Sequence, residues 1–382
     1  MQPFILSREQ LLTDLYMAYY DARRHKRNKP YQLKFEEHLE ENLESLCDEL
    51  YCRTYKPLPS TCFLISDPKK REVFAADFRD RIVHHLYYNY THELFERTFI
   101  PDSYSCIKGR GTHFGIDRLE QHIRQESHSW QEPCWVLKMD IRGYFMHINR
   151  QRLLSITLSL LDRMESHSIG SMAWGECLDM DFLRYLTHEI VLLDPIADCR
   201  IKGSPADWHS LPRDKSLFFS PKGCGLPIGN LTSQLFSNVY LGRLDEFMKR
   251  TLRCRHYGRY VDDFYVVSAS REWLHTLIPQ VRKFLKEELD LTLHEGKVRI
   301  CSVNQGVEFL GAYLKPHRRY VSNTTLRRMQ RKLPSLEQET DAERLRSRIA
   351  SFRGVLSHYS TGWLFLKPAF RLLRRKASTS SV

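Results

Sequence analysis

The stretch RYVDDFYVV, from Arg259 to Val267, decides how this 382-residue chain is expected to fold. Its apolar residues predict two strands, around His256–Val261 and Phe264–Val267, with Asp262 and Asp263 at the turn of a hairpin. An isolated Asp-Asp pair is usually a surface turn. Here the apolar flanks indicate two partly buried carboxylates, for which metal ions are the expected partners.

A third aspartate ends another predicted strand. Residues Trp135–Ile141 alternate in polarity, and Asp140 lies at the end of that run. Nucleotidyl transfer needs two hard cations, one at the attacking hydroxyl and one at the triphosphate, and carboxylates are the natural ligands of such ions. Three aspartates on adjacent strands therefore predict a two-metal site.

These two segments resemble the reverse transcriptase family. YVDD, from Tyr260 to Asp263, is similar to the YxDD box of that family, whereas viral RNA-copying polymerases usually have Gly before the acidic pair. VLKMDIRGYFMHI, from Val136 to Ile148, resembles its first metal-binding motif. The resemblance implies an RNA-directed DNA polymerase with two Mg²⁺ ions, for which Mn²⁺ can substitute. The implied metal-binding residues are Asp140, Ile141, Asp262 and Asp263.

Two upstream segments resemble the fingers motifs that bind the incoming dNTP. They are PKKREVFAADFRDRIVHH, from Pro68 to His85, and DSYSCIKGRGTH, from Asp102 to His113, which has Ile107 where relatives usually have Arg. Phe145 falls at the family's steric gate, a ring that excludes ribonucleotides; a core phenylalanine is the alternative. The implied dNTP-binding residues are Arg71, Lys69, Lys108, Arg110, Tyr144, Phe145, Gly229 and Gln234.

Two downstream segments complete the resemblance. LTLHEGKVRI, from Leu291 to Ile300, is similar to the motif whose lysine protonates the leaving pyrophosphate, which implies Lys297; a solvated lysine is the alternative. Phe309, Leu310 and Gly311 resemble the primer grip, where glycine allows close backbone approach.

The segment GCGLPIGNLTSQLFSNVYL, from Gly223 to Leu241, indicates the subfamily. Most relatives have Gln-Gly, three residues and then Ser-Pro, where this chain has Ile228-Gly229 and then Ser233-Gln234. That pattern resembles the reverse transcriptases of diversity-generating retroelements, which misincorporate opposite adenines in a template RNA. Without the Gln donor, selection depends on apolar fit, which discriminates by only ~1–3 kcal/mol. The implied template and fidelity residues are Ile228, Asn230 and Ser233.

Three alternatives stay open. Antiphage-defence reverse transcriptases share these boxes, and retron enzymes are a weaker rival because Ser360–Gly362 reads STG where they have VTG. A catalytically inactive RNA-binding scaffold would carry the same basic charge. The intact set of three aspartates argues against that scaffold.

The positive charge is concentrated near the C-terminus. Lys315–Lys376 holds 16 Lys and Arg against 4 Asp and Glu, a surplus of 12 that equals the net charge of the chain. Such a surplus favours binding to a polyanion, although a solvated helix face is the alternative. Apolar residues recur at helical spacing, and we expect the nucleic-acid contacts at Arg327, Arg328, Arg331 and Lys332.

The expected fold class is α/β, with an α+β palm in a right-hand polymerase. We expect fingers at 1–133, interleaved with the palm, and a palm at 134–315. The palm carries an insertion at about 194–225, a long loop that contains Pro, Gly, Asp and Ser. A basic helical thumb is expected at 316–376 and a tail at 377–382. Predicted elements outside the catalytic strands are a helix after the cap residue Ser7, helices at about Phe35–Leu50, Phe78–Phe95 and Leu153–Leu161, and a strand at Cys62–Ile65.

The ten cysteines form no CxxC pair, which predicts reduced thiols in a cytoplasm. No stretch approaches ~20 uninterrupted apolar residues, so no membrane span is expected. The family resemblance implies as partners a template RNA, the cDNA/RNA hybrid, dNTPs and a small basic accessory protein.

Overall fold

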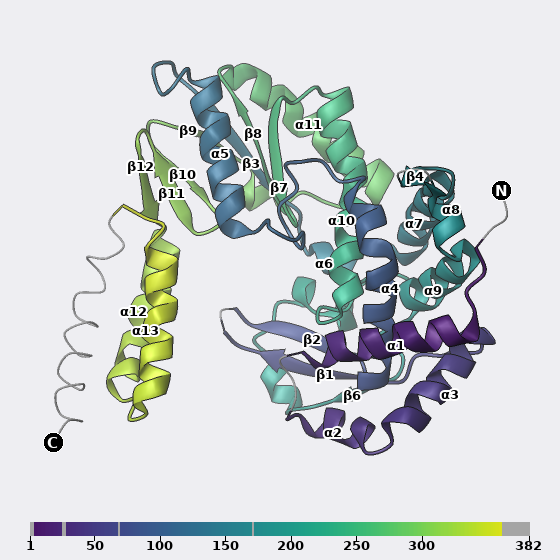
Figure 1. Cartoon of the computed structure of the whole chain (residues 1–382). Helices are drawn as coiled ribbons and strands as arrows, with labels where there is room; N and C mark the ends of the chain where they lie inside the picture. Colours follow the sequence, from purple (N-terminus) through teal and green to yellow (C-terminus); the bar gives the residue numbers. More distant parts are fainter. Residues whose placement is uncertain (1–3, 25–27, 68, 170–171, 361–382) are drawn as a thin grey trace. The chain divides into compact units, whose positions relative to one another are not determined.

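The computed structural model describes residues 4–24, 28–67, 69–169 and 172–360, and they form two compact units (Figure 1). Unit 1 comprises Met1–Pro101, Ile141–Arg253 and Gln280–Leu293. Unit 2 comprises Asp102–Asp140, Cys254–Pro279 and His294–Val382. Each unit is thus assembled from three separate segments of the chain.

A four-stranded antiparallel sheet is the centre of unit 2. Its strand order is β7-β8-β3-β9, so the hairpin strand β8 pairs with the strand that ends in Asp140. The predicted hairpin and the predicted strand before Asp140 are therefore confirmed. The turn lies one residue earlier than predicted, at Val261 and Asp262, so that Asp263 begins β8. The bounds of the strands are β3 Trp135–Asp140, β7 His256–Tyr260, β8 Asp263–Ser268 and β9 Arg299–Ser302.

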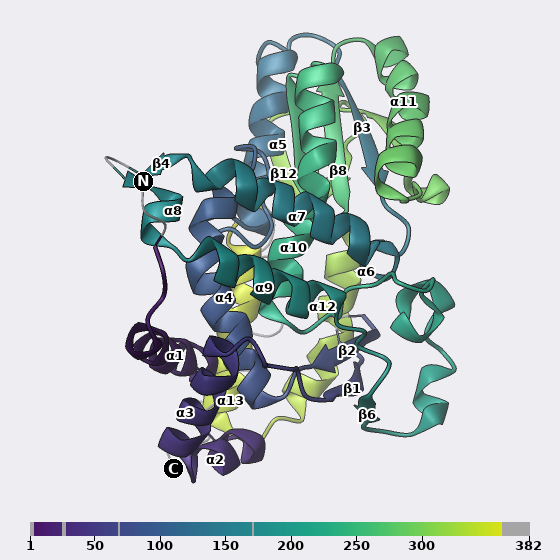
Figure 2. The same ribbon diagram turned by 90° about the vertical axis from the view of Figure 1, so that its right-hand side faces the viewer.

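Helix α5, Thr112–Glu126, packs against this sheet, beside which it lies in Figure 2. Ile116, Leu119 and Ile123 of α5 are fully buried in one cluster with Val136 and Tyr265 of the sheet. The helix therefore supports the strands that carry the three aspartates.

A smaller sheet and two helices follow the four-stranded sheet along the chain. The strands are β10 Val307–Phe309, β11 Ala312–Lys315 and β12 Arg318–Val321, and the helices are α12 Asn323–Glu337 and α13 Ala342–Leu356. The predicted helical spacing is confirmed, because Leu336, Leu345 and Ile349 form a buried cluster between α12 and α13. The predicted thumb beyond residue 360 and the tail lie outside the described residues.

Unit 1 is mainly helical. Helix α10 lies in contact with α4 and α7, and α7 also packs on α9, as Figure 2 shows. Its longer helices are α1 Arg8–Arg23, α2 Pro30–Glu36, α3 Leu39–Tyr51, α4 Phe78–Glu96, α7 Arg150–Glu165, α9 Met180–Leu192 and α10 Leu231–Glu246. Shorter elements are α6 Tyr144–His147, α8 Trp174–Cys177, β4 Ser168–Ile169 and β5 Met172–Ala173. Helix α11, Arg271–Leu289, contributes residues to both units.

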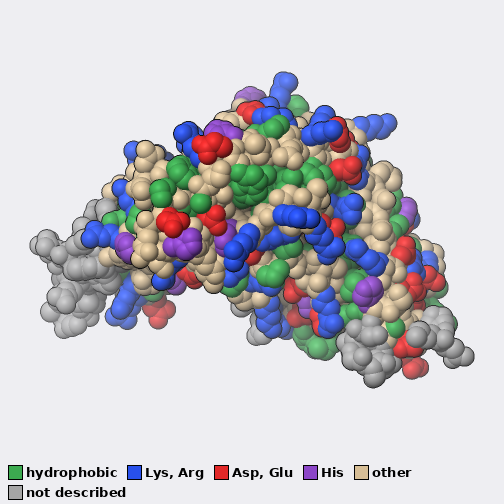
Figure 3. Space-filling model, turned by 90° about the horizontal axis from the view of Figure 1, so that it is seen from above, with side chains coloured by type: hydrophobic (Ala, Val, Ile, Leu, Met, Phe, Trp, Pro, Cys, Tyr) green, Lys and Arg blue, Asp and Glu red, His purple; other side chains and the backbone are tan. Residues whose placement is uncertain are grey.

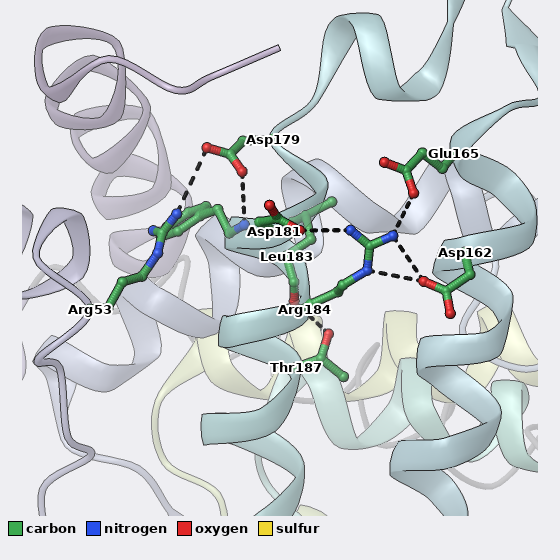
Figure 4. A network of polar contacts seen from close by, with 9 residues as sticks. Arg53, Asp162, Glu165, Asp179, Asp181, Leu183, Arg184 and Thr187 are labelled. Atoms are coloured by element: carbon green, nitrogen blue, oxygen red, sulfur yellow. Dashed lines mark hydrogen bonds and ion pairs between the residues drawn. The ribbon is translucent and has the colours of Figure 1, made fainter. Parts of the chain in front are cut away.

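Ion pairs join α7 to α9. Arg184 of α9 contacts Asp162 at 2.8 Å and Glu165 at 2.5 Å, both on α7, and it also pairs with Asp181 at 2.9 Å (Figure 4). The planar guanidinium can serve several carboxylates at once, which fixes the contact between the two helices.

Unit 1 contains a three-stranded sheet with the order β2-β1-β6. Strands β1 Ser60–Ile65 and β2 Arg71–Ala75 form an antiparallel pair, and β6 Cys199–Ile201, from the insertion, joins β1 in parallel. Three short 3-10 helices complete the insertion: Pro205–Trp208, Arg213–Lys215 and Leu217–Phe219. The predicted loop therefore joins this sheet through β6 and otherwise contains short 3-10 helices.

The N-terminal prediction is confirmed in part. Ser7 caps α1 by accepting a bond from the Gln10 backbone N–H at 3.1 Å. The single helix predicted at Phe35–Leu50 is wrong, because α2 ends at Glu36 and α3 begins at Leu39. His38 between them has φ −132° and ψ 49°, a backbone conformation that no α-helix contains.

The described residues contain no helix long and apolar enough to cross a membrane. All ten cysteines are free thiols.

Candidate active site

Asp140 and Asp263 lie directly opposite each other in adjacent strands. Tyr260 pairs with Asp263, so Val261 and Asp262 form the two-residue turn of the hairpin. Val261 has φ +56°, in the left-handed region. That conformation is strained for a β-branched residue, at a cost of roughly 1–3 kcal/mol. The surrounding structure must therefore hold this turn in place.

The side chain of Arg259 holds the turn of Val261 and Asp262 in place. Its side chain is fully buried, and one guanidinium nitrogen donates to the Val261 carbonyl oxygen at 3.1 Å. The other lies 3.4 Å from the Ser103 hydroxyl. A buried charge needs such partners, since an unpaired one is costly. Sequence reasoning did not assign Arg259 a role; an arginine in an otherwise apolar strand was the available signal.

The loop that contains Ser103 pairs with β7 through one isolated parallel bridge, between Ser103 and Arg259. The Tyr104 N–H donates to the Arg259 carbonyl at 3.0 Å, and the Arg259 N–H donates to the Asp102 carbonyl at 2.9 Å. Gly258 allows this approach, because a Cβ atom there would lie 2.2 Å from the Tyr104 hydroxyl. The first residues of the predicted second fingers motif thus pack on the hairpin that carries Asp262 and Asp263.

A buried polar network lies on the same loop. Tyr104 Oη is 2.8 Å from Tyr265 Oη, which is 3.0 Å from His122 Nδ1. Arg118 of α5 pairs with Asp102 at 2.7 Å. Burial raises the pKa of Tyr265 well above its ordinary value, so its hydroxyl stays protonated. These contacts join α5 to the strand β8 that begins at Asp263.

The carboxylates of the hairpin repel one another. Burial, and then the charge of Asp140, raise the pKa of Asp262 from 3.8 to about 7. Burial raises the pKa of Asp263 to about 6, while nearby Lys138 acts in the opposite direction. Charged carboxylates in this arrangement are stabilised by a cation.

Lys297 provides one such cation. Its Nζ lies 2.7 Å from Asp140 Oδ2, and the lysine side chain is 53% exposed. The backbone supports this pair, because the His294 N–H donates to the Asp140 carbonyl at 2.8 Å and Lys297 ends the 3-10 helix Glu295–Lys297. The predicted proton donor is therefore beside the predicted metal ligand.

The donor chemistry of the three aspartates fits hard divalent cations, which prefer oxygen ligands. The fit is electrostatic as well, because a cation would relieve the repulsion that raises the pKa of Asp262. Among the described residues, no group of three His, Cys, Asp or Glu side chains is already arranged as a metal site, so the carboxylates of Asp140, Asp262 and Asp263 would have to close around an ion as it binds. Ile141, also predicted to bind metal, is buried in unit 1, where it forms a bridge with Leu293.

The predicted primer grip is the turn between β10 and β11. Leu310 and Gly311 form its two residues, with φ +48° and +86°, so both are left-handed. Phe309 is fully buried and meets Tyr265 edge to face, with ring centroids 5.1 Å apart. The turn is thus fixed to the sheet that carries Asp263.

Two predicted selectivity residues share one apolar cluster in unit 1. Phe145 and Ile228 are both half-buried against a core that includes Phe74 and Leu217. Gly229 follows at φ +133°, where a Cβ atom would lie 2.7 Å from the Phe74 carbonyl oxygen. The chain therefore needs glycine at this position.

The neighbouring candidates differ in exposure. Tyr144 is buried and donates to the Ser237 carbonyl at 2.6 Å. Asn230 is buried with its Oδ1 3.3 Å from the Ala76 backbone nitrogen, and Ser233 is also buried. Gln234 is exposed on the first turn of α10.

The basic candidates are divided between the units. Arg71 and Lys69 are exposed in unit 1 and Lys108 is exposed in unit 2, where Arg110 donates to the Ser103 carbonyl at 3.0 Å. On α12 the side chains of Arg327, Arg328 and Arg331 are exposed and Lys332 is half-buried. Figure 3, a view from above, shows Lys and Arg interspersed with Asp and Glu on that face.

Comparison with known proteins identifies the family. The model of the reverse transcriptase (RNA-dependent DNA polymerase) family matches residues 67–314, well over half of the chain. The chain belongs to the reverse transcriptase family. This membership confirms the predicted enzyme class, an RNA-directed DNA polymerase, and the family generally uses divalent metal ions.

Individual relatives are distant from this reverse transcriptase. Protein YkfC of Escherichia coli is 22% identical, over 70% of each chain. Apo telomerase of Candida tropicalis, truncated from its C-terminal domain, superposes with a TM-score of 0.50 at 10% identity, over 69% of this chain and 55% of its own. Telomerase of Candida albicans gives 0.46 at 11% identity, over 84% and 60%. The chain spans little more than half of these telomerases, and the first supports the predicted right-hand polymerase fold alone.

Proposed function

We propose that this reverse transcriptase copies a template RNA into cDNA with errors directed to adenines, as part of a diversity-generating retroelement. Membership of the reverse transcriptase family supports the polymerase activity. The position of Ile228 supports the error-prone character, because its side chain lies in one apolar cluster with the steric-gate candidate Phe145. An apolar wall offers the templating pair shape but no hydrogen bond.

Asp140, Asp262 and Asp263 would hold two Mg²⁺ ions, which Mn²⁺ can replace. When bound, such ions supply Lewis-acid activation of the primer hydroxyl and charge neutralisation at the triphosphate. Lys297 would donate a proton to the leaving pyrophosphate, for which its position beside Asp140 is suitable. Phe145 would exclude a ribose 2′ hydroxyl by steric overlap.

The proposed partners follow from the same family resemblance. Arg71, with Lys69, Lys108 and Arg110, would bind the triphosphate of the dNTP, and Phe309–Gly311 would support the primer end. Exposed arginines of α12 would bind the phosphates of the RNA or the hybrid. A small basic accessory protein completes the set for a retroelement, and the proposed compartment is a bacterial cytoplasm.

Sequencing the cDNA tests this function. The enzyme is supplied with an RNA template, a primer, dNTPs and Mg²⁺, and we expect errors opposite adenine to exceed those opposite the other three bases. An error spectrum without adenine bias would favour an antiphage-defence or retron-type reverse transcriptase. A protein that binds RNA but never extends a primer would indicate a scaffold.

A variant at Ile228 tests the mechanism. Ile228→Gln restores a polar group of similar reach, so errors opposite adenine should fall more than errors opposite other bases. Extension on a template without adenine serves as the control and should persist. Should the adenine bias remain unchanged in the variant, the subfamily would stand and the role of Ile228 would be withdrawn.

A further inference from the structure

We propose that the insertion, residues 194–225, forms the rear wall of the nucleotide pocket and that Glu72 is the positioning residue that fixes this wall. The inference rests on the proposed function, because it concerns the same selectivity residues, Phe145 and Ile228. It assigns a role to a segment and to a buried carboxylate that the reaction itself does not use.

Glu72 is a buried carboxylate that accepts hydrogen bonds from three residues of the insertion. Its side chain is 1% exposed, and one carboxylate oxygen accepts bonds from Trp208 Nε1 at 2.7 Å and Ser216 Oγ at 2.8 Å. The other oxygen accepts from the Leu217 backbone N–H at 2.7 Å. Three donors on one buried carboxylate make a strong and geometrically specific contact.

One face of strand β2 is buried and the other is more exposed. Side chains alternate along a strand, so Glu72 and Phe74 share the buried face while Arg71 lies on the exposed one. The triphosphate-binding candidate and the residue that fixes the insertion are therefore neighbours on one strand. A displacement of the insertion would reach the nucleotide through this strand.

Three backbone and side-chain contacts reinforce the attachment. Strand β6 pairs with β1, the Lys202 N–H donates to the Cys62 carbonyl at 2.8 Å, and Lys70 Nζ lies 2.7 Å from Ser210 Oγ. The insertion is thus held along its length. Glu72 bonds to the insertion at Leu217, whose side chain belongs to the apolar cluster around Phe145.

The apolar cluster packs behind both selectivity residues, Phe145 and Ile228. Leu217, Phe218 and Trp208 of the insertion belong to the same cluster as Phe145 and Ile228. The backbone follows the same route, since the Leu226 N–H donates to the Phe145 carbonyl at 2.8 Å and the Phe74 N–H donates to the Ile228 carbonyl at 2.9 Å. Loosening the wall would let both side chains move, so selection of the sugar and of the base would weaken together.

The test compares Glu72→Gln with a matched control. Gln cannot accept at both positions, so its amide NH₂ would face a buried donor. The control is Asp179→Asn in the same unit, a carboxylate that accepts from the Phe182 N–H at 2.8 Å and the Leu6 N–H at 3.1 Å, beside Arg53 (Figure 4). Asp179 belongs to no part of the apolar cluster around Phe145.

We expect Glu72→Gln to lower the preference for dNTPs over ribonucleotides by roughly threefold to tenfold, with a higher KM for dNTP, while Asp179→Asn leaves both unchanged. In the double variant with Phe145→Ala, the loss should be no larger than with Phe145→Ala alone, because both changes act on one ring. Trp208→Phe removes a single donor and should reproduce the effect if Glu72→Gln fails to fold.

Unchanged sugar preference in a folded, active Glu72→Gln or Trp208→Phe enzyme would overturn the inference and leave the proposed function intact. Absence of primer extension by the unaltered enzyme on an RNA template with Mg²⁺ would instead overturn the proposed function.

Discussion

Lys297 Nζ lies 2.7 Å from Asp140 Oδ2, so the predicted proton donor and a predicted metal ligand form an ion pair. This relationship predicts that Lys297→Ala slows extension but tightens the binding of Mg²⁺. The extension rate at saturating dNTP should fall at least about tenfold, since general-acid catalysis contributes roughly 10²–10⁴-fold. The Mg²⁺ concentration for half-maximal activity should also fall, because a competing cation is removed from Asp140.

Metal titration of primer extension measures both quantities. Lys286→Ala, an exposed lysine of α11, is the control and should alter neither. An unchanged rate would return Lys297 to the status of a solvated lysine.

Arg259 should prove essential for the rate of extension rather than for binding of dNTP. Arg259→Lys removes the bond to the Val261 carbonyl, so the strained turn that carries Asp262 should relax and kcat should fall about tenfold or more with a smaller change in KM. Adding Val261→Gly should recover part of the rate, since glycine adopts a positive φ without strain. Equal kcat in Arg259→Lys and the unaltered enzyme would show that the turn holds without the guanidinium.

Stability without metal should depend on pH through Asp262. Its pKa is raised from 3.8 in the unfolded chain to about 7 in the fold, so between these values the folded state binds more protons than the unfolded state. The free energy of unfolding should therefore decrease as pH rises from about 4 to about 7 and level off above. Asp262→Asn should remove this contribution, giving a higher Tm than the unaltered chain at pH 8 in EDTA but a similar Tm at pH 4.

Thermal unfolding at the two pH values measures this difference. A Tm gap between the two proteins that is larger at pH 4 than at pH 8 would contradict the burial and repulsion inferred for Asp262.

The exposed arginines of α12 should set the salt dependence of RNA binding. Replacing Arg327, Arg328, Arg331 and Lys332 by Gln should weaken binding to any sequence and reduce the slope of log K against log salt by roughly one unit for each phosphate that the variant no longer neutralises. Binding isotherms at several salt concentrations give the slope. The matched control replaces four exposed basic residues of α11, namely Arg271, Arg282, Lys283 and Lys286. If both variants reduced the slope equally, α12 would contribute only through the net charge of the protein and not as a specific binding surface.

The hairpin of Asp262 and Asp263 could be predicted from sequence to within one residue, because the pattern that specifies it is local. Strands flanking Asp262 and Asp263 show the apolar pattern of a sheet, and the turn residues lie between them. The role of Arg259 could not be predicted, since its guanidinium acts on a carbonyl two residues away and on a loop far along the chain. Sequence spacing does not show where a buried arginine points.

The structure of the insertion could not be predicted from sequence either, because it depends on long-range contacts. Its Pro, Gly and Ser content predicted a loop, whereas contacts more than 130 residues apart, such as Trp208 with Glu72, order it. The break at His38 was also missed, because apolar spacing continues across it. The boundaries at 133, 315 and 376 remain predictions. Interleaving of the fingers with the palm was expected, but the three segments that make up each compact unit were not.

Primer extension by Asp140→Asn and Asp262→Asn tests the central claim most directly. Each protein is given an RNA template, a DNA primer, dNTPs and Mg²⁺, and its folding is verified by thermal unfolding. We expect the unaltered enzyme to extend the primer and both variants to remain folded without detectable extension, because each loses a metal-binding charge. Extension by either folded variant at the rate of the unaltered enzyme would contradict the assignment of the active site.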